Sequence, residues 1–224
     1  EIFKARHIQE SEPGHYVVIK RILPHLVDED RFMKMFQTEA YVTANLNHPN
    51  IPRCIDFCAD TEMPYMVLEH VYGRDLISVG QKLRRSNERL PLELALFVCE
   101  RVADALHCAH TFVNENQVNQ PIIHRDVSPE NIMMGYSGTV HILDFGIARL
   151  EGDTTETQAG VLKGKVGYIT PEQLNGGDVD ARTDIFSLGV VLHELLTGRP
   201  LFLSENEFLT VDKIRQGNVR PPSD

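Results

Sequence analysis

The residues His124-Arg125-Asp126-Val127-Ser128-Pro129-Glu130-Asn131 are followed, 13 positions after the asparagine, by Asp144-Phe145-Gly146. These two strings place an aspartate, an asparagine and a second aspartate at a spacing that suits phosphoryl transfer from a nucleotide. Such transfer requires the protein mainly to position its reactants and to neutralise charge. Asp126 suits contact with the acceptor hydroxyl, whereas Asn131 and Asp144 offer the hard oxygen ligands that Mg²⁺ prefers. An isolated D-F-G would indicate only a turn, but the two strings together predict a catalytic centre.

The two strings resemble the catalytic loop and the metal-binding loop of the eukaryotic-like, or Hanks-type, protein kinases, and in particular their bacterial Ser/Thr branch. The resemblance extends over nearly all of the 224 residues. It implies an α+β, two-lobed protein-kinase-like fold, with an N-lobe of a small sheet and one helix at 1–71 and a mainly helical C-lobe at 72–224. It also implies ATP and Mg²⁺ as cofactors and Ser/Thr hydroxyls of proteins as acceptors.

Composition is that of a globular protein, with 42% hydrophobic and 24% charged residues. The formal net charge of −10 argues against nucleic acid or an anionic membrane surface as the main partner. No apolar run is long enough to cross a membrane, and no signal peptide is recognised. The resemblance implies a cytoplasmic catalytic part, which in this family is often joined to membrane-anchored or sensory regions. The four cysteines, Cys54, Cys58, Cys99 and Cys108, lack the spacing of a zinc site and are expected to be reduced thiols.

The periodicity of the chain changes along its length. Alternating and β-branched stretches predict strands at 1–8, 15–23, 51–58 and 64–71, and a hairpin formed by 130–134 and 139–143 around Ser137-Gly138. Apolar residues at helical spacing predict helices over 28–46, 91–113 and 184–196. The strands and one helix come first and the other helices follow, which favours a small sheet-rich segment and a larger helical one.

Lys20 and Glu39 form a predicted ion pair. Lys20 ends an apolar strand, and Glu39 lies on the apolar face of the 28–46 helix, between Phe36 and Thr43. A buried carboxylate without a cationic partner is costly, so Glu39 requires one, and Lys20 is the natural candidate. The resemblance implies that this lysine holds the nucleotide's phosphates.

Four further residues are assigned to nucleotide binding only by the resemblance. The backbone of Glu69 and Val71 matches the family's adenine-binding hinge, and Leu68 matches the side chain that guards the pocket behind it. Val18, on the strand that ends at Lys20, matches a residue of the same pocket.

Other residues match structural positions of the family. His124 is expected to pack on Phe145, and Asp184 to accept hydrogen bonds from the catalytic-loop backbone without a salt bridge. Glu172, in Thr170-Pro171-Glu172, matches a glutamate that the family pairs with an arginine. Arg125 indicates an activation loop that is ordered by phosphate. Thr154, Thr155 and Thr157 are the candidate phosphosites, and their autophosphorylation would involve self-association.

Three departures from the family pattern stand out. The Gly-rich phosphate loop and the last helices are absent, so the chain is expected to be an excerpt of a longer protein. Ser128 stands where the family usually carries lysine, and Lys165 stands where the facing loop usually carries threonine. We interpret these as a swapped pair in which Lys165 reaches the catalytic centre from the opposite side. The stem of lysine is flexible enough for one ammonium to reach one spot from either loop.

Two other functions remain open. The fold could serve as a pseudokinase that binds or scaffolds with little turnover, although Lys20, Asp126, Asn131 and Asp144 are all intact. It could instead be a small-molecule phosphotransferase of the same fold. Residues 160–172, which kinases use to dock a polypeptide, favour a protein kinase.

Overall fold

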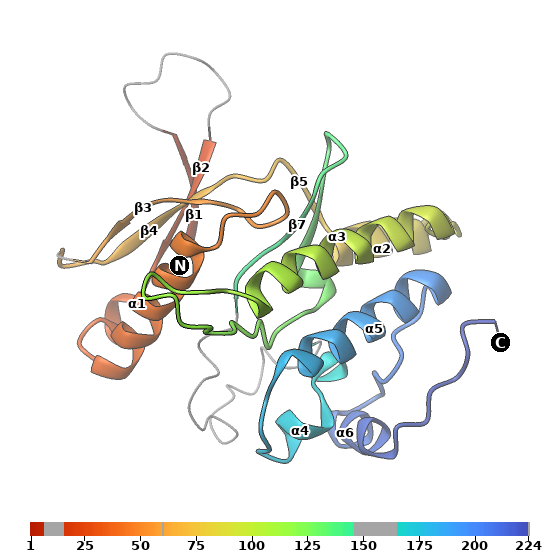
Figure 1. Cartoon of the computed structure of the whole chain (residues 1–224). Coiled ribbons are helices and arrows are strands. Elements are labelled where there is room, and N and C mark those ends of the chain that lie inside the picture. The colour runs from red at the N-terminus through yellow and green to blue at the C-terminus, as the bar shows by residue number, and fades with distance from the viewer. Residues whose placement is uncertain (7–15, 60, 146–164, 224) are drawn as a thin grey trace.

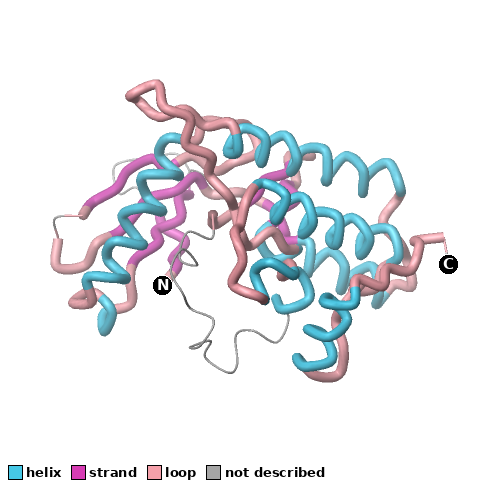
Figure 2. The backbone as a smooth tube through the Cα atoms, turned by 60° about the horizontal axis from the view of Figure 1, so that its bottom comes forward, coloured by secondary structure: helices cyan, strands magenta, loops and turns pink. Residues whose placement is uncertain are grey.

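The computed structural model of the chain describes residues 1–6, 16–59, 61–145 and 165–223. They form a sheet-rich lobe with one long helix and a larger, mainly helical lobe, which lie side by side in two views (Figures 1 and 2). The α+β, two-lobed architecture predicted from the sequence is therefore confirmed.

The sheet of the smaller lobe has four antiparallel strands in the order β1-β2-β4-β3. Its elements are β1 (Ile2–Arg6), β2 (Tyr16–Arg21), α1 (Asp30–Asn45), β3 (Cys54–Cys58) and β4 (Tyr65–Glu69), with a 3₁₀ turn η1 (Pro24–Leu26) before α1. Phe36 and Ala40 of α1 are buried against Ile22 and Met66. The apolar face of α1 thus fixes the helix on the sheet, and the opposite face is left to solvent.

The larger lobe is organised around two long helices, α3 (Leu92–His110) and α5 (Ala181–Thr197), which pack on each other. A second antiparallel sheet has the order β5-β6-β7, and β7 contacts α3. The remaining elements are β5 (Gly73–Asp75), β6 (Ile132–Gly135), β7 (Val140–Ile142), α2 (Leu76–Arg85), α4 (Pro171–Leu174), α6 (Glu207–Gln216) and the 3₁₀ turns η2 (Pro129–Asn131) and η4 (Lys165–Tyr168).

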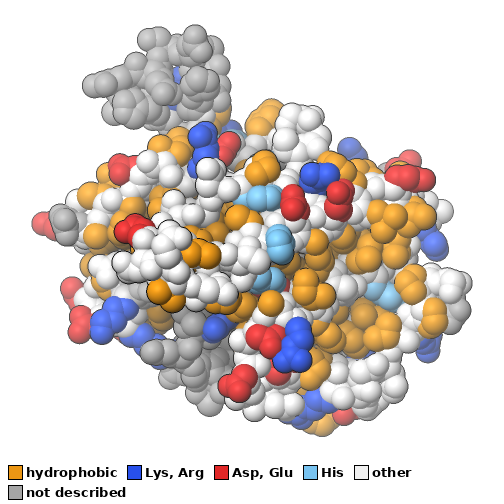
Figure 3. Space-filling view, viewed as in Figure 1, with side chains coloured by type: hydrophobic (Ala, Val, Ile, Leu, Met, Phe, Trp, Pro, Cys, Tyr) orange, Lys and Arg blue, Asp and Glu red, His pale blue; other side chains and the backbone are white. Residues whose placement is uncertain are grey.

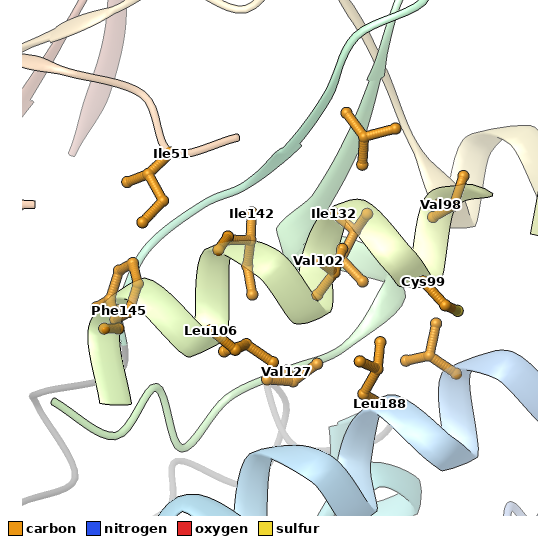
Figure 4. Close-up of a cluster of buried hydrophobic side chains, with 14 of the residues drawn as sticks. Ile51, Val98, Cys99, Val102, Leu106, Val127, Ile132, Ile142, Phe145 and Leu188 are labelled. Atoms are coloured by element: carbon orange, nitrogen blue, oxygen red, sulfur yellow. The ribbon is translucent and has the colours of Figure 1, made fainter. Parts of the chain in front are cut away.

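The main hydrophobic core lies where α3 meets β6, β7 and α5 (Figure 4). Ile51 joins this core, although it follows α1 in sequence, and it lies near Phe145 and Ile142 in Figure 4. Its neighbour Asn50 donates a hydrogen bond from Nδ2 to the carbonyl oxygen of Val140 (2.7 Å) and accepts one at its own carbonyl from the N–H of Ile142 (2.9 Å). The segment after α1 is therefore bonded to the larger lobe.

Most predicted elements are present with shorter bounds. The strand predicted at 51–58 begins only at Cys54, because Ile51 packs in the core of the larger lobe. The predicted hairpin forms, with Gly138 at a φ of 85°, a left-handed conformation that glycine adopts without steric cost. Its first strand begins at Ile132, since residues 129–131 form the turn η2.

The sequence did not predict β5, α2 and α6 as separate elements. β5 has only three residues, and the short helices α2 and α6 carry several charged residues each. Side-chain caps define their starts: Asp75 accepts from the N–H of Ser78 (2.7 Å), and Asn206 accepts from that of Leu209 (2.9 Å).

Hydrophobic side chains are visible over α3 and α5 on the face shown in Figure 3, and charged side chains surround them. Leu92 and Leu96 of α3 are among the exposed ones. None of the helices in the described ranges combines the length and the apolar character that a bilayer span requires.

Candidate active site

A cavity of about 470 Å³ lies between the two lobes. Val18 of β2 and Leu68 of β4 line it from the smaller lobe, and Met133 and Ile142 line it from the larger one. Glu69 and Val71, at the end of β4 and in the connection to β5, line it as well, together with His70 between them. The four residues assigned to adenine by resemblance, Val18, Leu68, Glu69 and Val71, thus face one largely apolar cavity. An apolar cavity with a few polar groups is what a flat, uncharged ring requires.

Lys20 brings two carboxylates together at the polar part of this cavity. Its Nζ contacts Glu39 Oε1 and lies 2.9 Å from Asp144 Oδ1. Burial by itself lowers the pKa of Lys20, but the charges of Asp144 and Glu39 outweigh it and the pKa is raised above its ordinary value. The predicted contact between Lys20 and Glu39 is therefore present, and the lysine remains a cation throughout the physiological pH range.

Asn131 and Asp144 are brought close by the backbone. The N–H of Leu143, which precedes Asp144, donates to the carbonyl oxygen of Asn131 at 2.7 Å. Asp144 has a φ of 49°, a left-handed conformation that is unusual outside glycine and is found at functional sites. The side chains offer one carboxylate and one amide oxygen, and such hard donors suit a Mg²⁺ ion whose remaining ligands are water and phosphate.

Asp126 lies in a network of hydrogen bonds with the other catalytic-loop residues. Nδ2 of Asn131 donates to the Asp126 carbonyl oxygen (2.8 Å) and to its Oδ2 (2.9 Å). Lys165, from the turn η4, donates to the same Oδ2 at 2.9 Å, and its Nζ is 3.7 Å from Glu130 Oε2. The ammonium of Lys165 therefore reaches the carboxylate of Asp126 from the facing segment.

Ser128, the other member of the predicted swapped pair, does not contact Asp126. It is 1% exposed, and its Oγ has no hydrogen-bond partner among the residues that the structure describes. The hydroxyl is enclosed two residues from Asp126 without reaching it. The structure thus brings Lys165, but not Ser128, into contact with the carboxylate of Asp126.

His124 packs against the aromatic ring of Phe145, with 4.7 Å between the ring centroids, as predicted. Its Nε2 is 2.9 Å from the carbonyl oxygen of Leu143. Burial lowers the pKa of His124, and this effect exceeds the opposing charges of Asp184, Asp126 and Asp144. A fully buried imidazole of this kind is neutral at pH 7 and acts as a structural group.

This buried imidazole predicts an acid-sensitive stability. Because the pKa of His124 is lower in the folded chain than in the unfolded one, the unfolded state binds the extra proton below about pH 6.5, and stability falls as pH falls. His124→Gln should make the unfolding free energy less dependent on pH between 7.5 and 5.5 by up to about 1.4 kcal/mol per pH unit. Urea unfolding at several pH values measures this, with His25→Gln, at an exposed position, as the control. Equal slopes for His124→Gln and the parent would contradict the assignment.

Asp184 accepts hydrogen bonds from two backbone N–H groups of the catalytic loop. Its carboxylate, which is fully buried, accepts from the N–H of His124 and from the N–H of Arg125, both at 2.8 Å. The sequence predicted these bonds but not a third partner: Nε2 of His110, on α3, is 2.7 Å from Asp184 Oδ2. The predicted backbone bonds are therefore present, and a side-chain contact that the sequence did not predict lies beside them. The carboxylate of Asp184 joins α5, α3 and the catalytic loop.

The short helix α4, which contains Glu172, is hydrogen-bonded to α5 and to Arg125 of the catalytic loop. Glu172 accepts a hydrogen bond from Thr183 Oγ1 at 2.8 Å. Among the described residues, its carboxylate is thus bound by a hydroxyl. Gln173 donates to the carbonyl oxygen of Arg125 (3.0 Å), and Thr170 caps α4 through a reciprocal pair of bonds with Gln173. Thr154, Thr155 and Thr157 lie outside the described residues.

One set of contacts near the site, centred on Glu194, was not predicted from the sequence. Tyr168 Oη donates to Glu194 Oε2, and Glu194 Oε1 is 3.6 Å from Nη1 of Arg84. Glu194 lies on a helix that is apolar on nearly all sides, which could have suggested a buried partner, but nothing in the spacing identifies Tyr168 or Arg84. This link ties η4, which carries Lys165, to α5 and α2.

The comparison with known protein families decides the classification. A sequence model described as "Protein kinase domain" matches residues 2–221. The chain belongs to the protein kinase family. Its geometry agrees with that membership, since the catalytic-loop and metal-loop strings are joined by the hydrogen bond from the N–H of Leu143 to Asn131 and by the packing of His124 on Phe145.

Several curated proteins are similar over most of this chain. "Tyrosine-protein kinase MasK" of Myxococcus xanthus is 40% identical over 222 residues, which are 99% of this chain and 34% of that protein. "Probable serine/threonine-protein kinase CPE1738" of Clostridium perfringens is 32% identical over 99% of this chain and 30% of its own length. "Serine/threonine-protein kinase PrkC" of Bacillus subtilis is 35% identical over 85% of this chain and 28% of its own length. The chain thus spans about a third of these relatives.

Proposed function

We propose that this chain is the catalytic domain of an ATP- and Mg²⁺-dependent protein serine/threonine kinase that works in the cytoplasm. The observation that carries the proposal is Lys20, which contacts Glu39 and Asp144 at the polar end of a cavity with room for a nucleotide base. The names of relatives such as PrkC support Ser/Thr acceptors.

Each residue then has a defined task. Lys20, positioned by Glu39, binds the phosphates, and Asn131 and Asp144 hold Mg²⁺, which supplies positive charge to the phosphates when bound. The carboxylate of Asp126 orients the acceptor hydroxyl and takes its proton. Lys165 keeps a cation beside Asp126, where negative charge develops during transfer.

Radiolabelled ATP tests the reaction directly. The purified protein should transfer label to itself or to a generic basic protein, and phosphoamino acid analysis should recover phosphoserine or phosphothreonine. Asp126→Asn should abolish the label. Nucleotide binding without any transfer would instead identify a pseudokinase, and label on a small molecule alone would identify a small-molecule phosphotransferase.

A second candidate is transfer to tyrosine. The observation that favours it is the 40% identity to a relative named as a tyrosine-protein kinase. The same phosphoamino acid analysis decides between the two acceptors, because phosphotyrosine as the main product would replace the Ser/Thr assignment.

We expect autophosphorylation at one or more of Thr154, Thr155 and Thr157. The family resemblance gives Arg125, next to Asp126 in the sequence, the role of pairing with a phosphate, and an Arg–phosphate pair is a strong, charge-assisted contact. Mass spectrometry of the ATP-treated protein should show phosphate between residues 150 and 165, and the triple Thr→Ala variant should show none there. An active protein without phosphate in this range would count decisively against these sites. Incorporation that rises with protein concentration would indicate self-association.

A further inference from the structure

Gln173 joins the start of α4 to the catalytic loop. Its Oε1 accepts from the backbone N–H (3.0 Å) and from Oγ1 (3.2 Å) of Thr170, while its Nε2 donates to the carbonyl oxygen of Arg125 (3.0 Å). A backbone N–H only donates and a carbonyl only accepts, so these partners fix which end of the amide faces which. One side chain thus completes the cap of α4 and also binds a residue 48 positions earlier in the chain.

The backbone on both sides of Arg125 is held by hydrogen bonds. Arg125 has a φ of 66°, a left-handed conformation that residues with a Cβ seldom adopt, so its surroundings must hold it there. Its N–H donates to Asp184 Oδ1 (2.8 Å). The peptide group after it is bonded at both ends, because Gln173 binds the C=O and the N–H, which belongs to Asp126, donates to Nδ1 of His124 (3.3 Å). Since a peptide group is planar, these two bonds fix the position of the Asp126 Cα.

The amide of Gln173 is supported by a neighbouring contact between α4 and α5. Glu172, next to it in sequence, accepts from Thr183 Oγ1 at 2.8 Å, and Thr183 directly precedes Asp184. Two consecutive residues of α4 and two of α5 therefore meet at Arg125, where Asp184 binds the N–H and Gln173 binds the C=O. We call Gln173, Asp184 and the backbone of Arg125 the Arg125 clamp.

We propose that Gln173 is a positioning residue for phosphoryl transfer: its hydrogen bond holds the backbone of Arg125 and thereby aims the carboxylate of Asp126 at the acceptor hydroxyl. The inference rests on the proposed kinase function, in which Asp126 orients that hydroxyl. Correct aim of a reacting group accounts for a large part of a catalysed rate, and small displacements are costly. Gln173 is not among the described residues that line the nucleotide cavity, so the Arg125 clamp should affect turnover rather than ATP binding.

The alternative is that Gln173 only caps α4, and the capping box makes the two roles separable. At this position of a capping box glutamate serves as well as glutamine, because only an acceptor oxygen is needed. An ionised carboxylate has no hydrogen to donate to the carbonyl oxygen of Arg125. Gln173→Glu therefore keeps the cap and removes the bond to the catalytic loop. Gln173→Met, which is uncharged and similar in size, removes both.

Steady-state kinetics with radiolabelled ATP and a generic basic protein compares these variants with the parent. Both should lower kcat by about tenfold and leave the KM for ATP unchanged, since each loses one hydrogen bond that aims a reacting group. A fall in the uncharged Met variant shows that the charge of the glutamate is not the cause. Asn206→Ala, which removes the cap of α6 at an exposed position, is the control for lost helix capping and should lower Tm but keep the parental kcat. A parental kcat for Gln173→Glu would overturn the inference.

Amide hydrogen exchange of the nucleotide-free protein measures the Arg125 clamp without any reaction. The N–H of Arg125 is bonded to Asp184 and should exchange about tenfold faster in Gln173→Glu, because the loop then opens locally at a lower cost. The N–H groups within α3 should keep their parental rates, which would show that the change is local. Parental exchange of the Arg125 N–H in Gln173→Glu overturns the inference whatever the turnover.

The two measurements separate this inference from the proposed function. If the parent transfers phosphate and Gln173→Glu is equally active, the role of Gln173 is overturned while the kinase function stands. If the parent transfers no phosphate to any acceptor, the proposed function fails. Hydrogen exchange still judges the clamp in that case: faster exchange at Arg125 supports the hold of Gln173 on the loop, and parental exchange overturns it.

Discussion

Asp144→Asn is expected to lower turnover by about 10³-fold while the protein remains folded. The variant keeps the size and the hydrogen-bonding shape of the side chain but removes the negative charge that faces Lys20 and the proposed Mg²⁺ site. Loss of one preorganised electrostatic contact commonly costs about 10²–10³ in rate, and loss of the charged metal ligand affects both metal binding and phosphate positioning. Initial rates with radiolabelled ATP at saturating Mg²⁺ measure the effect.

Two controls make this result specific. Asp178→Asn removes the same charge from an exposed position of the larger lobe and should leave turnover unchanged. Circular dichroism and thermal unfolding should show that Asp144→Asn retains the fold, since Lys20 keeps its contact with Glu39. Turnover within about tenfold of the parent would exclude Asp144 as an essential metal ligand.

Lys165→Ala is expected to lower turnover by about 10²-fold. Its ammonium lies 2.9 Å from the Asp126 carboxylate, and a preorganised cation at that place is comparable to a single oxyanion donor, worth about 3 kcal/mol. Lys213→Ala, on α6, removes an exposed lysine far from the site in sequence and serves as the control. Steady-state kinetics should show a lower kcat for Lys165→Ala and little change for Lys213→Ala.

The swapped-pair hypothesis also predicts the activity of a double variant. Ser128→Lys combined with Lys165→Thr should recover much of the turnover that Lys165→Ala loses, because the double variant returns a cation from the catalytic loop. The enclosure of Ser128, at 1% exposed, means that the new lysine must extend toward Asp126 rather than into the core. Near-parental activity of Lys165→Ala would show the hypothesis to be wrong.

The sequence predicted those parts of the site where a buried charged side chain requires a partner of opposite charge. Glu39 on an apolar helix face requires a cation, and Lys20 ends the neighbouring strand, so their contact followed from burial and charge. The two departures read together predicted that Lys165 reaches the catalytic centre, and the structure shows its ammonium on Asp126.

The parts that sequence did not predict depend on the folded packing alone. His110 and Asp184 are 74 positions apart, and their contact exists only because α3 and α5 pack together. The link of Arg84, Glu194 and Tyr168 likewise joins three elements, and no local period or charge pattern reports it. β5 was not predicted because its three residues are too few to show an alternating pattern of apolar and polar side chains.

The attachment of Asn50 to β7 gives the smaller lobe a pivot. Asn50 and Ile51 are fixed to the larger lobe by two hydrogen bonds and by burial, whereas β2 reaches that lobe through the contact of Lys20 with Asp144. A rotation of the lobes about this point would lengthen the Lys20–Asp144 contact, whereas the Lys20–Glu39 contact lies within the smaller lobe and would be kept. The length of the Lys20–Asp144 contact would therefore report the angle between the two lobes.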